Sequence, residues 1–165
     1  MRRILPLSTL GIFALSACTS LSDMPTGTSL TDLEQKFGAP SISCPAENPN
    51  RFVWSMQPMG QKAWGVDINA QQQLTEVAQV LTDQHFALLS KDTWDKNQVL
   101  CYFGPPAQKM TLPYYGVNKQ VWAYRYKQYN SWDSMMYLYF NDTGVVEHYS
   151  SGPDPLTLQD GIFFR

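Results

Sequence analysis

Apolar residues recur at helical spacing near the start of the chain and again in its second half. Leu30, Leu33 and Phe37 form the first stripe, and Gly38 follows it directly. Spacings of three and four residues are typical of an amphipathic helix, and glycine is the usual residue at a left-handed helix end. The pattern therefore predicts a short helix over 30–37 that stops at Gly38.

A second, weaker stripe follows the same plan. Val99 and Phe103 occupy its last two positions and Gly104 follows, but Lys96 stands where the first stripe has a leucine. We expect a second helix that ends at Gly104. Between the stripes, an N-cap residue at position 82 or 83 precedes apolar residues, which predicts a short connecting helix through Leu89.

Beyond each stripe, large apolar residues alternate with small or polar ones, as in a half-buried strand. The pattern predicts three strands in each half, and their short connections make them antiparallel. We expect these strands at 51–56, 64–69 and 73–81 in the first half and at 120–126, 136–141 and 145–150 in the second. Val53-Trp54 is aligned with Val121-Trp122. The sequence thus predicts an α+β fold, a tandem repeat of a helix packed on a three-stranded antiparallel meander.

The first residues have the pattern of an export signal. Two arginines precede an apolar run of twelve residues, Ile4 to Leu15, which is too short to cross a bilayer as a stable helix. The tetrapeptide that ends at Cys18 resembles the lipobox of bacterial lipoproteins, in which the cysteine thiol receives the lipid. The alternative is an ordinary secreted protein with a chance cysteine. In such lipoproteins a threonine after the cysteine, here Thr19, implies sorting to the periplasmic face of the outer membrane.

These patterns divide the chain into segments. We predict a signal peptide (1–17), a flexible tether (18–28), a first module (29–82), a second module (83–155) and a C-terminal tail (156–165). The tether is assigned because its residues are mostly Ser, Thr, Gly and Pro, without apolar periodicity.

Composition and motifs exclude several classes of function. The 165 residues include 12 basic and 14 acidic side chains, a net charge of -2, which does not suit nucleic-acid binding. His85 and His148 are the two histidines, and no zinc-binding, hydrolase or phosphate-loop motif is present. We expect no metal, no cofactor and no catalytic residues, although a nucleophile and a base could assemble from distant parts of the chain.

Three cysteines would be an odd number for a secreted protein. Lipid on Cys18 leaves Cys44 and Cys101 as the two thiols in an oxidising compartment. The pair is a candidate disulfide that would join the first repeat to the second. Two free thiols are the alternative, because nothing in the sequence places one cysteine near the other.

Aromatic residues of the second module separate by face. If Met136 faces the core, Tyr137 and Tyr139 point to the opposite face of the sheet. Tyr129 and Trp132 lie in the adjoining hairpin loop. These four side chains are candidates for binding a protein partner, since tyrosine and tryptophan offer large rigid contact areas. In the alternative, the two modules pack together through this face and bury the tyrosines.

Several short segments, taken in their order, resemble a known family. They are 81–86 (LTDQHF), 103–106 (FGPP), 121–126 (VWAYRY) and 152–155 (GPDP). From Gly27 to Pro155 the chain resembles the SmpA/BamE-like lipoproteins of Gram-negative outer membranes. Its tandem form is similar in arrangement to the two-repeat β-lactamase inhibitor protein. The resemblance implies small α+β modules at the inner leaflet of the outer membrane. For the best-understood member, which has one module, it also implies an accessory role in β-barrel assembly.

We therefore expect a non-catalytic, lipid-anchored outer-membrane lipoprotein that acts as a scaffold or accessory factor in envelope assembly. Its partners would be outer-membrane lipid, through the acylated N-terminus, and an envelope protein such as the β-barrel assembly machinery. The alternative is an inhibitor-like module that binds a soluble periplasmic enzyme through its sheet face. An envelope hydrolase is a third class.

Overall fold

The computed structural model describes residues 19–47 and 49–160. The predicted signal peptide and the lipidation site Cys18 lie outside the described residues. The first half contains the helical segments η1 (Leu21–Asp23) and α1 (Leu30–Phe37) and the strands β1 (Ile42–Cys44), β2 (Arg51–Ser55), β3 (Ala63–Ile68) and β4 (Leu74–Gln79). The second half contains α2 (Asp83–Phe86), η2 (Ala87–Ser90), α3 (Lys96–Phe103), β5 (Gln108–Tyr114), β6 (Val117–Gln128), β7 (Trp132–Phe140), β8 (Val146–Pro153) and α4 (Pro155–Asp160).

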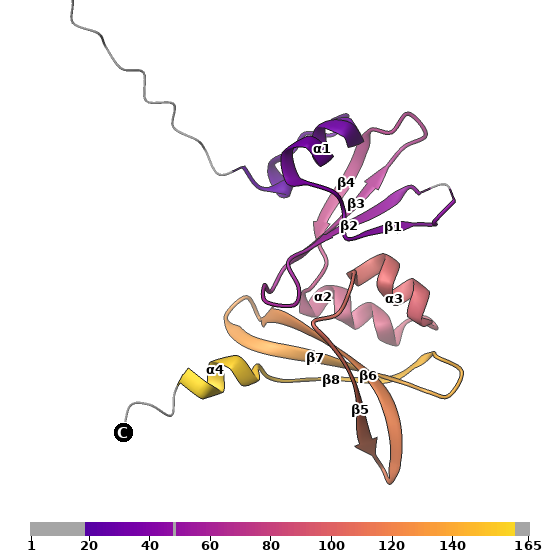
Figure 1. Cartoon of the computed structure of the whole chain (residues 1–165), viewed down its shortest axis with the longest axis vertical. Helices are drawn as coiled ribbons and strands as arrows, with labels where there is room; N and C mark the ends of the chain where they lie inside the picture. The colour runs from indigo at the N-terminus through magenta and orange to yellow at the C-terminus, as the bar shows by residue number, and fades with distance from the viewer. Residues whose placement is uncertain (1–18, 48, 161–165) are drawn as a thin grey trace, which may run out of the picture.

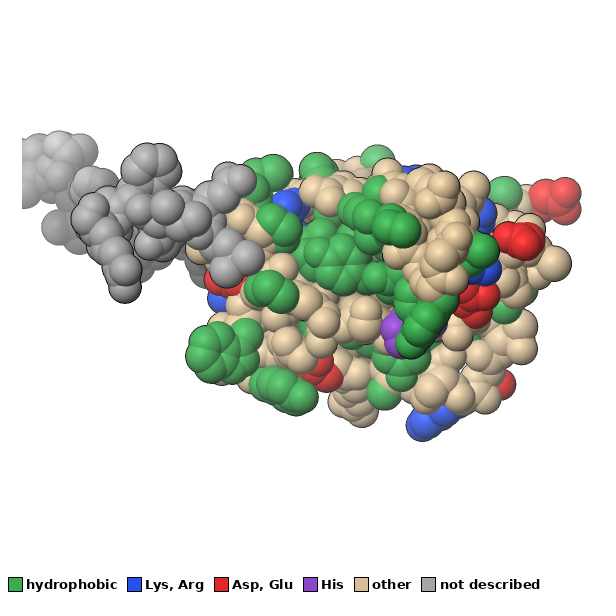
Figure 2. Space-filling view, turned by 90° about the horizontal axis from the view of Figure 1, so that it is seen from below, with side chains coloured by type: hydrophobic (Ala, Val, Ile, Leu, Met, Phe, Trp, Pro, Cys, Tyr) green, Lys and Arg blue, Asp and Glu red, His purple; other side chains and the backbone are tan. Residues whose placement is uncertain are grey.

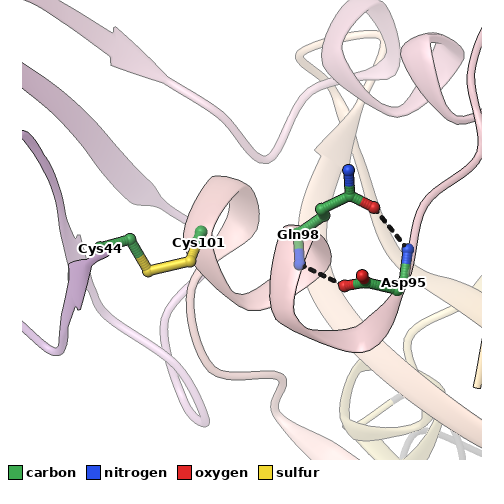
Figure 3. The surroundings of a disulfide bond; sticks show 4 residues. All are labelled: Cys44, Asp95, Gln98 and Cys101. Carbon is green, nitrogen blue, oxygen red and sulfur yellow. Dashed lines mark hydrogen bonds between the residues drawn. A yellow bond between two sulfur atoms is a disulfide. The ribbon is translucent and has the colours of Figure 1, made fainter. Parts of the chain in front are cut away.

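Side-chain caps begin the two predicted amphipathic helices, and glycines end them. The Ser29 side chain accepts a hydrogen bond from the Asp32 backbone N–H at the start of α1. Asp95 and Gln98 form a reciprocal capping box at the start of α3 (Figure 3). Both helices stop at a glycine with positive φ, Gly38 at 79° and Gly104 at 80°. The helix ends predicted at these glycines are confirmed.

Each half forms a four-stranded antiparallel sheet, so the predicted three-stranded meander is wrong by one strand. The orders are β1-β2-β3-β4 in the first sheet and β5-β6-β7-β8 in the second. The missed strands, β1 and β5, both lie at an edge. β1 has three residues, and β5 contains Pro113, which lacks a backbone donor and suits an edge strand. β1 is too short to show alternation, whereas Met110, Leu112 and Tyr114 of β5 do alternate with Thr111 and Pro113.

The alignment of the two repeats also needs a correction. The indole of Trp54 donates to the Gly38 carbonyl at 2.7 Å, and the hydroxyl of Tyr124 donates to the Gly104 carbonyl at 3.0 Å. Trp54 is therefore equivalent to Tyr124, and its predicted alignment with Trp122 is shifted by two residues. Such a shift leaves every side chain on its original face, so alternation along the strand does not reveal it.

The elements stack in alternating layers of helix and sheet (Figure 1). One core joins α1 to the first sheet through residues that include Leu33, Phe52 and Val66. The other core combines Val53 from the first sheet with buried residues of α2, α3 and the second sheet. The helices α2 and α3 therefore lie between the sheets. We call the α3-facing side of the first sheet the covered face, and the side of the second sheet turned away from α2 and α3 the open face.

Part of the segment predicted to be a tether is structured. Leu21 in η1 is buried in the core beneath α1, and the Gly27 backbone N–H donates to the Leu74 carbonyl at 2.8 Å. The buried Leu21 is three positions after Cys18 in the sequence. None of the helices among the described residues is long and apolar enough to cross a membrane.

Candidate functional site

Tyr137 and Tyr139 lie on the open face. In the β6–β7 pairing, Tyr137 is opposite Ala123 and Tyr139 is opposite Val121. The intervening Leu138 is buried against the helices, so alternation directs both tyrosines away from them. The tyrosine face is thus not buried between the modules, because helices α2 and α3 occupy that space. Val121 and Ala123, the small residues opposite these tyrosines on the same face, are fully buried.

A cluster of rings extends this surface toward the β5–β6 hairpin. Tyr114 lies 4.9 Å from Tyr139 and 5.3 Å from His148 between ring centroids, and Tyr139 lies 5.4 Å from His148. Figure 2 shows hydrophobic side chains gathered over this face of the molecule. Sequence reasoning did not place Tyr114 and His148 in the site, because the strand that carries Tyr114 was not recognised. The Tyr-Gly dipeptide at 115–116 was the available sequence signal for a hairpin turn. In the structure both residues have positive φ.

The charges on this surface are neutralised within the chain. Lys119 pairs with Glu147 at 3.1 Å. Partial burial raises the pKa of the Tyr137 hydroxyl, and the nearby Asp154 carboxylate raises it further. The open face therefore presents neutral rings and hydroxyl groups, which suit contact with a protein surface more than attraction of a charged ligand.

Tyr129 and Trp132 form a separate surface at the β6–β7 hairpin. Trp132 is paired with Gln128, and alternation places it on the same face as the core residue Met136, opposite to Tyr139. The Tyr129 backbone N–H donates to Asp83 at 2.7 Å, while its side chain is exposed. The structure thus divides the four predicted residues into two pairs on different surfaces.

A buried arginine joins the open face to the first module. Arg125 pairs through Nε with Asp154 at 2.9 Å, and both side chains are buried. Its Nη1 donates to the Pro58 carbonyl in the β2–β3 loop. From the same loop, Gln57 donates to the Arg125 carbonyl at 2.8 Å and accepts from the Arg125 backbone N–H at 3.2 Å. No local sequence pattern predicts these contacts.

A disulfide fixes α3 to the covered face. Cys44 at the end of β1 and Cys101 in α3 are bonded, with Cα atoms 5.7 Å apart (Figure 3). The candidate disulfide is thus formed in the structure, and it joins the two repeats. Gly104, just beyond α3, lies against Val53 of the same face.

Polar contacts surround a cleft of about 750 Å³ beside this disulfide. Arg51 pairs with Asp67 at 2.6 Å and lies over the ring of Tyr102 at 5.1 Å. The Tyr102 hydroxyl is 2.7 Å from Nδ1 of His85. Burial lowers the pKa of His85 and raises that of Tyr102. The buried Nε of Arg51 has no hydrogen-bond partner among the described residues. Because Arg51 contacts Asp67 of β3 and Tyr102 of α3, this network acts as a contact between the modules.

Within residues 19–47 and 49–160, no group of three or more His, Cys, Asp or Glu side chains is placed to hold a metal ion. Comparison of the chain with protein-family models, with curated proteins and with solved structures found no match.

Proposed function

We propose that this protein is a lipid-anchored, non-catalytic lipoprotein of the outer membrane that binds an envelope protein through its open face. The observation that carries the proposal is the contrast between the sheets. The first sheet is covered on both sides by helices of the chain, whereas the second presents aromatic side chains on the side away from α2 and α3.

Sequence features support the location and the role. The lipobox that ends at Cys18 and the following Thr19 are the basis for an acylated N-terminus at the periplasmic face of the outer membrane. The resemblance to SmpA/BamE-like lipoproteins supports an accessory role in envelope assembly, with the β-barrel assembly machinery as the candidate partner. A stack of two modules gives such a factor a rigid body, because a disulfide and buried polar contacts hold the modules together.

Site-specific photocrosslinking in intact cells tests the partner. A photoreactive phenylalanine analogue replaces Tyr139 on the open face, and Gln35, an exposed residue of α1, serves as the matched control position. We expect position 139 to capture a membrane β-barrel or a subunit of its assembly complex, and position 35 to capture neither. Equal capture at both positions would contradict the open-face site, and capture of a soluble periplasmic enzyme would favour the inhibitor-like alternative.

Acylation is tested separately. Mass spectrometry of the mature N-terminus should detect a lipid-modified Cys18, and the Cys18→Ser variant should leave the membrane fraction. An unmodified cysteine in a membrane-free protein would contradict the lipoprotein assignment.

A further inference from the structure

Large exposed apolar side chains gather at one end of the molecule. We call this the apolar end and define it by Met56 (58% exposed), Met59 (72%), Tyr129 (72%), Trp132 (70%) and Leu156 (41%). The methionines lie in or beside the β2–β3 loop, the aromatic residues in the β6–β7 hairpin and the leucine in α4. These three segments are distant in sequence, so their shared character is not a local effect.

Hydrogen bonds hold the three segments together. Gln61 of the β2–β3 loop donates to Asp133, the neighbour of Trp132. The Asp154 backbone N–H, just before α4, donates to the Asp133 carbonyl at 3.1 Å. The loops and α4 extend to the same side of the molecule in Figure 1, and hydrophobic side chains protrude at that end in Figure 2. The apolar end is therefore one surface.

The chemistry of this end suits a lipid interface. Tryptophan and tyrosine place an apolar ring and a polar group at the boundary between lipid and water, and methionine and leucine add apolar area. Four nearby charges are paired, Lys127 with Asp133 at 2.6 Å and Arg125 with Asp154 at 2.9 Å, while Lys62 of the β2–β3 loop is exposed without an ion pair in the described part of the chain. Insertion therefore leaves few unpaired charges to desolvate.

The start of the described chain also supports contact between the apolar end and a lipid bilayer. The indigo segment that leads into α1 lies on the same left-hand side of Figure 1 as the loops and α4. Three extended residues span about 10 Å, so lipid on Cys18 holds the buried Leu21 within that distance of the bilayer. One acyl chain binds a membrane only marginally, and a second apolar contact adds to it.

We propose that the apolar end inserts into the membrane–water interface and seats the protein on the bilayer. The proposal rests on the proposed function for the lipid anchor. The strands then stand upright on the membrane, and the open face points sideways, toward a partner held in the same membrane.

Vesicle flotation tests the proposal with the Cys18→Ser chain, so that acylation does not contribute. The probes are phosphatidylcholine vesicles, with and without phosphatidylglycerol, because apolar insertion does not depend on an anionic headgroup. We expect the Met59→Ser/Trp132→Ser variant to bind both kinds of vesicle about ten-fold more weakly than its parent. The matched control is Tyr115→Ser/Val117→Ser, which removes exposed apolar residues, 91% and 53% exposed, from the β5–β6 hairpin.

The control variant should bind vesicles as its parent does, and brominated lipid should quench Trp132 fluorescence, measured as the difference from Trp132→Phe. Equal binding by both double variants, or no quenching, would overturn the proposal, as would binding only to vesicles with phosphatidylglycerol. So would a Met59→Ser/Trp132→Ser chain that binds lipid normally but loses its protein crosslinks at position 139. None of these results depends on whether Cys18 is acylated, so failure of this inference and failure of the lipoprotein assignment remain distinguishable.

Discussion

The covered face and the open face are equivalent surfaces of two repeats, yet only the covered face packs against a helix of its own chain. On the covered face, Gly65 leaves room for the Arg51 guanidinium beneath α3, and an added Cβ would collide with it. The equivalent residue on the open face is Tyr137, which with Tyr139 lies beside Val121. At this strand position, glycine accompanies the face that packs against a helix, and tyrosine accompanies the face that does not.

The largest expected effect concerns the ion pairs of the two faces. Arg125→Ala leaves Asp154 buried without its partner, and we expect a loss of about 3–5 kcal/mol in the free energy of unfolding. On the covered face, Arg51→Ala should cost less, because Asp67 is 40% exposed and water can solvate it. Urea denaturation of both variants measures the difference. Equal losses of unfolding free energy would contradict the expectation that the buried pair Arg125–Asp154 contributes more to stability than the partly exposed pair Arg51–Asp67.

The disulfide should contribute nearly as much. Replacing both Cys44 and Cys101 by serine removes a crosslink between positions 57 residues apart, and we expect a loss of about 2–4 kcal/mol. A reductant should lower the stability of the wild-type protein to that of the variant and leave the variant unchanged. Amide exchange should rise in β1 on the covered face more than in β7 on the open face. A uniform rise would contradict a local role in holding α3.

A smaller effect is expected at the glycine that distinguishes the faces. Gly65→Ala should cost about 1–3 kcal/mol, because its methyl group displaces Arg51 and lies 2.9 Å from the Val80 side chain. Tyr137→Ala, on the open face, should cost about 1 kcal/mol or less, since its side chain is only half-buried. In an Arg51→Ala background the cost of Gly65→Ala should fall, which a double-mutant cycle measures. An unchanged cost would show that Arg51 is not the obstructed group.

The smallest effect is pH dependence at the covered face. Burial lowers the pKa of His85, Arg51 lowers it further and Glu76 opposes them. The folded protein therefore binds the proton less readily than the unfolded chain. The contribution of the neutral His85 ring to stability is complete above the pKa of the unfolded chain, about 6.5. This contribution is lost as the pH falls toward the lower pKa that His85 has in the folded protein. Thermal unfolding across this range should show a decline that His85→Gln reduces. An identical decline in both proteins would assign it to other groups.

Local patterns predicted the local parts of the fold. Gly38 and Gly104 marked the helix ends, and alternation located the inner strands and the outward direction of Tyr137 and Tyr139. The edge strands β4 and β8 were predicted, but β1 and β5 were missed, because β1 has only three residues and β5 contains Pro113, which an edge strand tolerates.

The arrangement of the modules was not predictable from the sequence. The contact between Gln57 and Arg125 joins two repeats through a side-chain amide and a backbone, and neither residue has a pattern that identifies the other. The apolar end was missed for the same reason, because its side chains come from three separate segments that only tertiary contacts bring together.

The contact between Gln57 and Arg125 also bears on the order of folding. β5 ends its pairing with β6 at Gln108 and Ala123, so the β6 backbone at Arg125 extends past its neighbour. An unpaired backbone of this kind can recruit a strand from another chain. The Gln57 amide occupies the Arg125 N–H and carbonyl, and it belongs to the module that is synthesised first. A first module that folds early therefore protects the second against aggregation as the second forms.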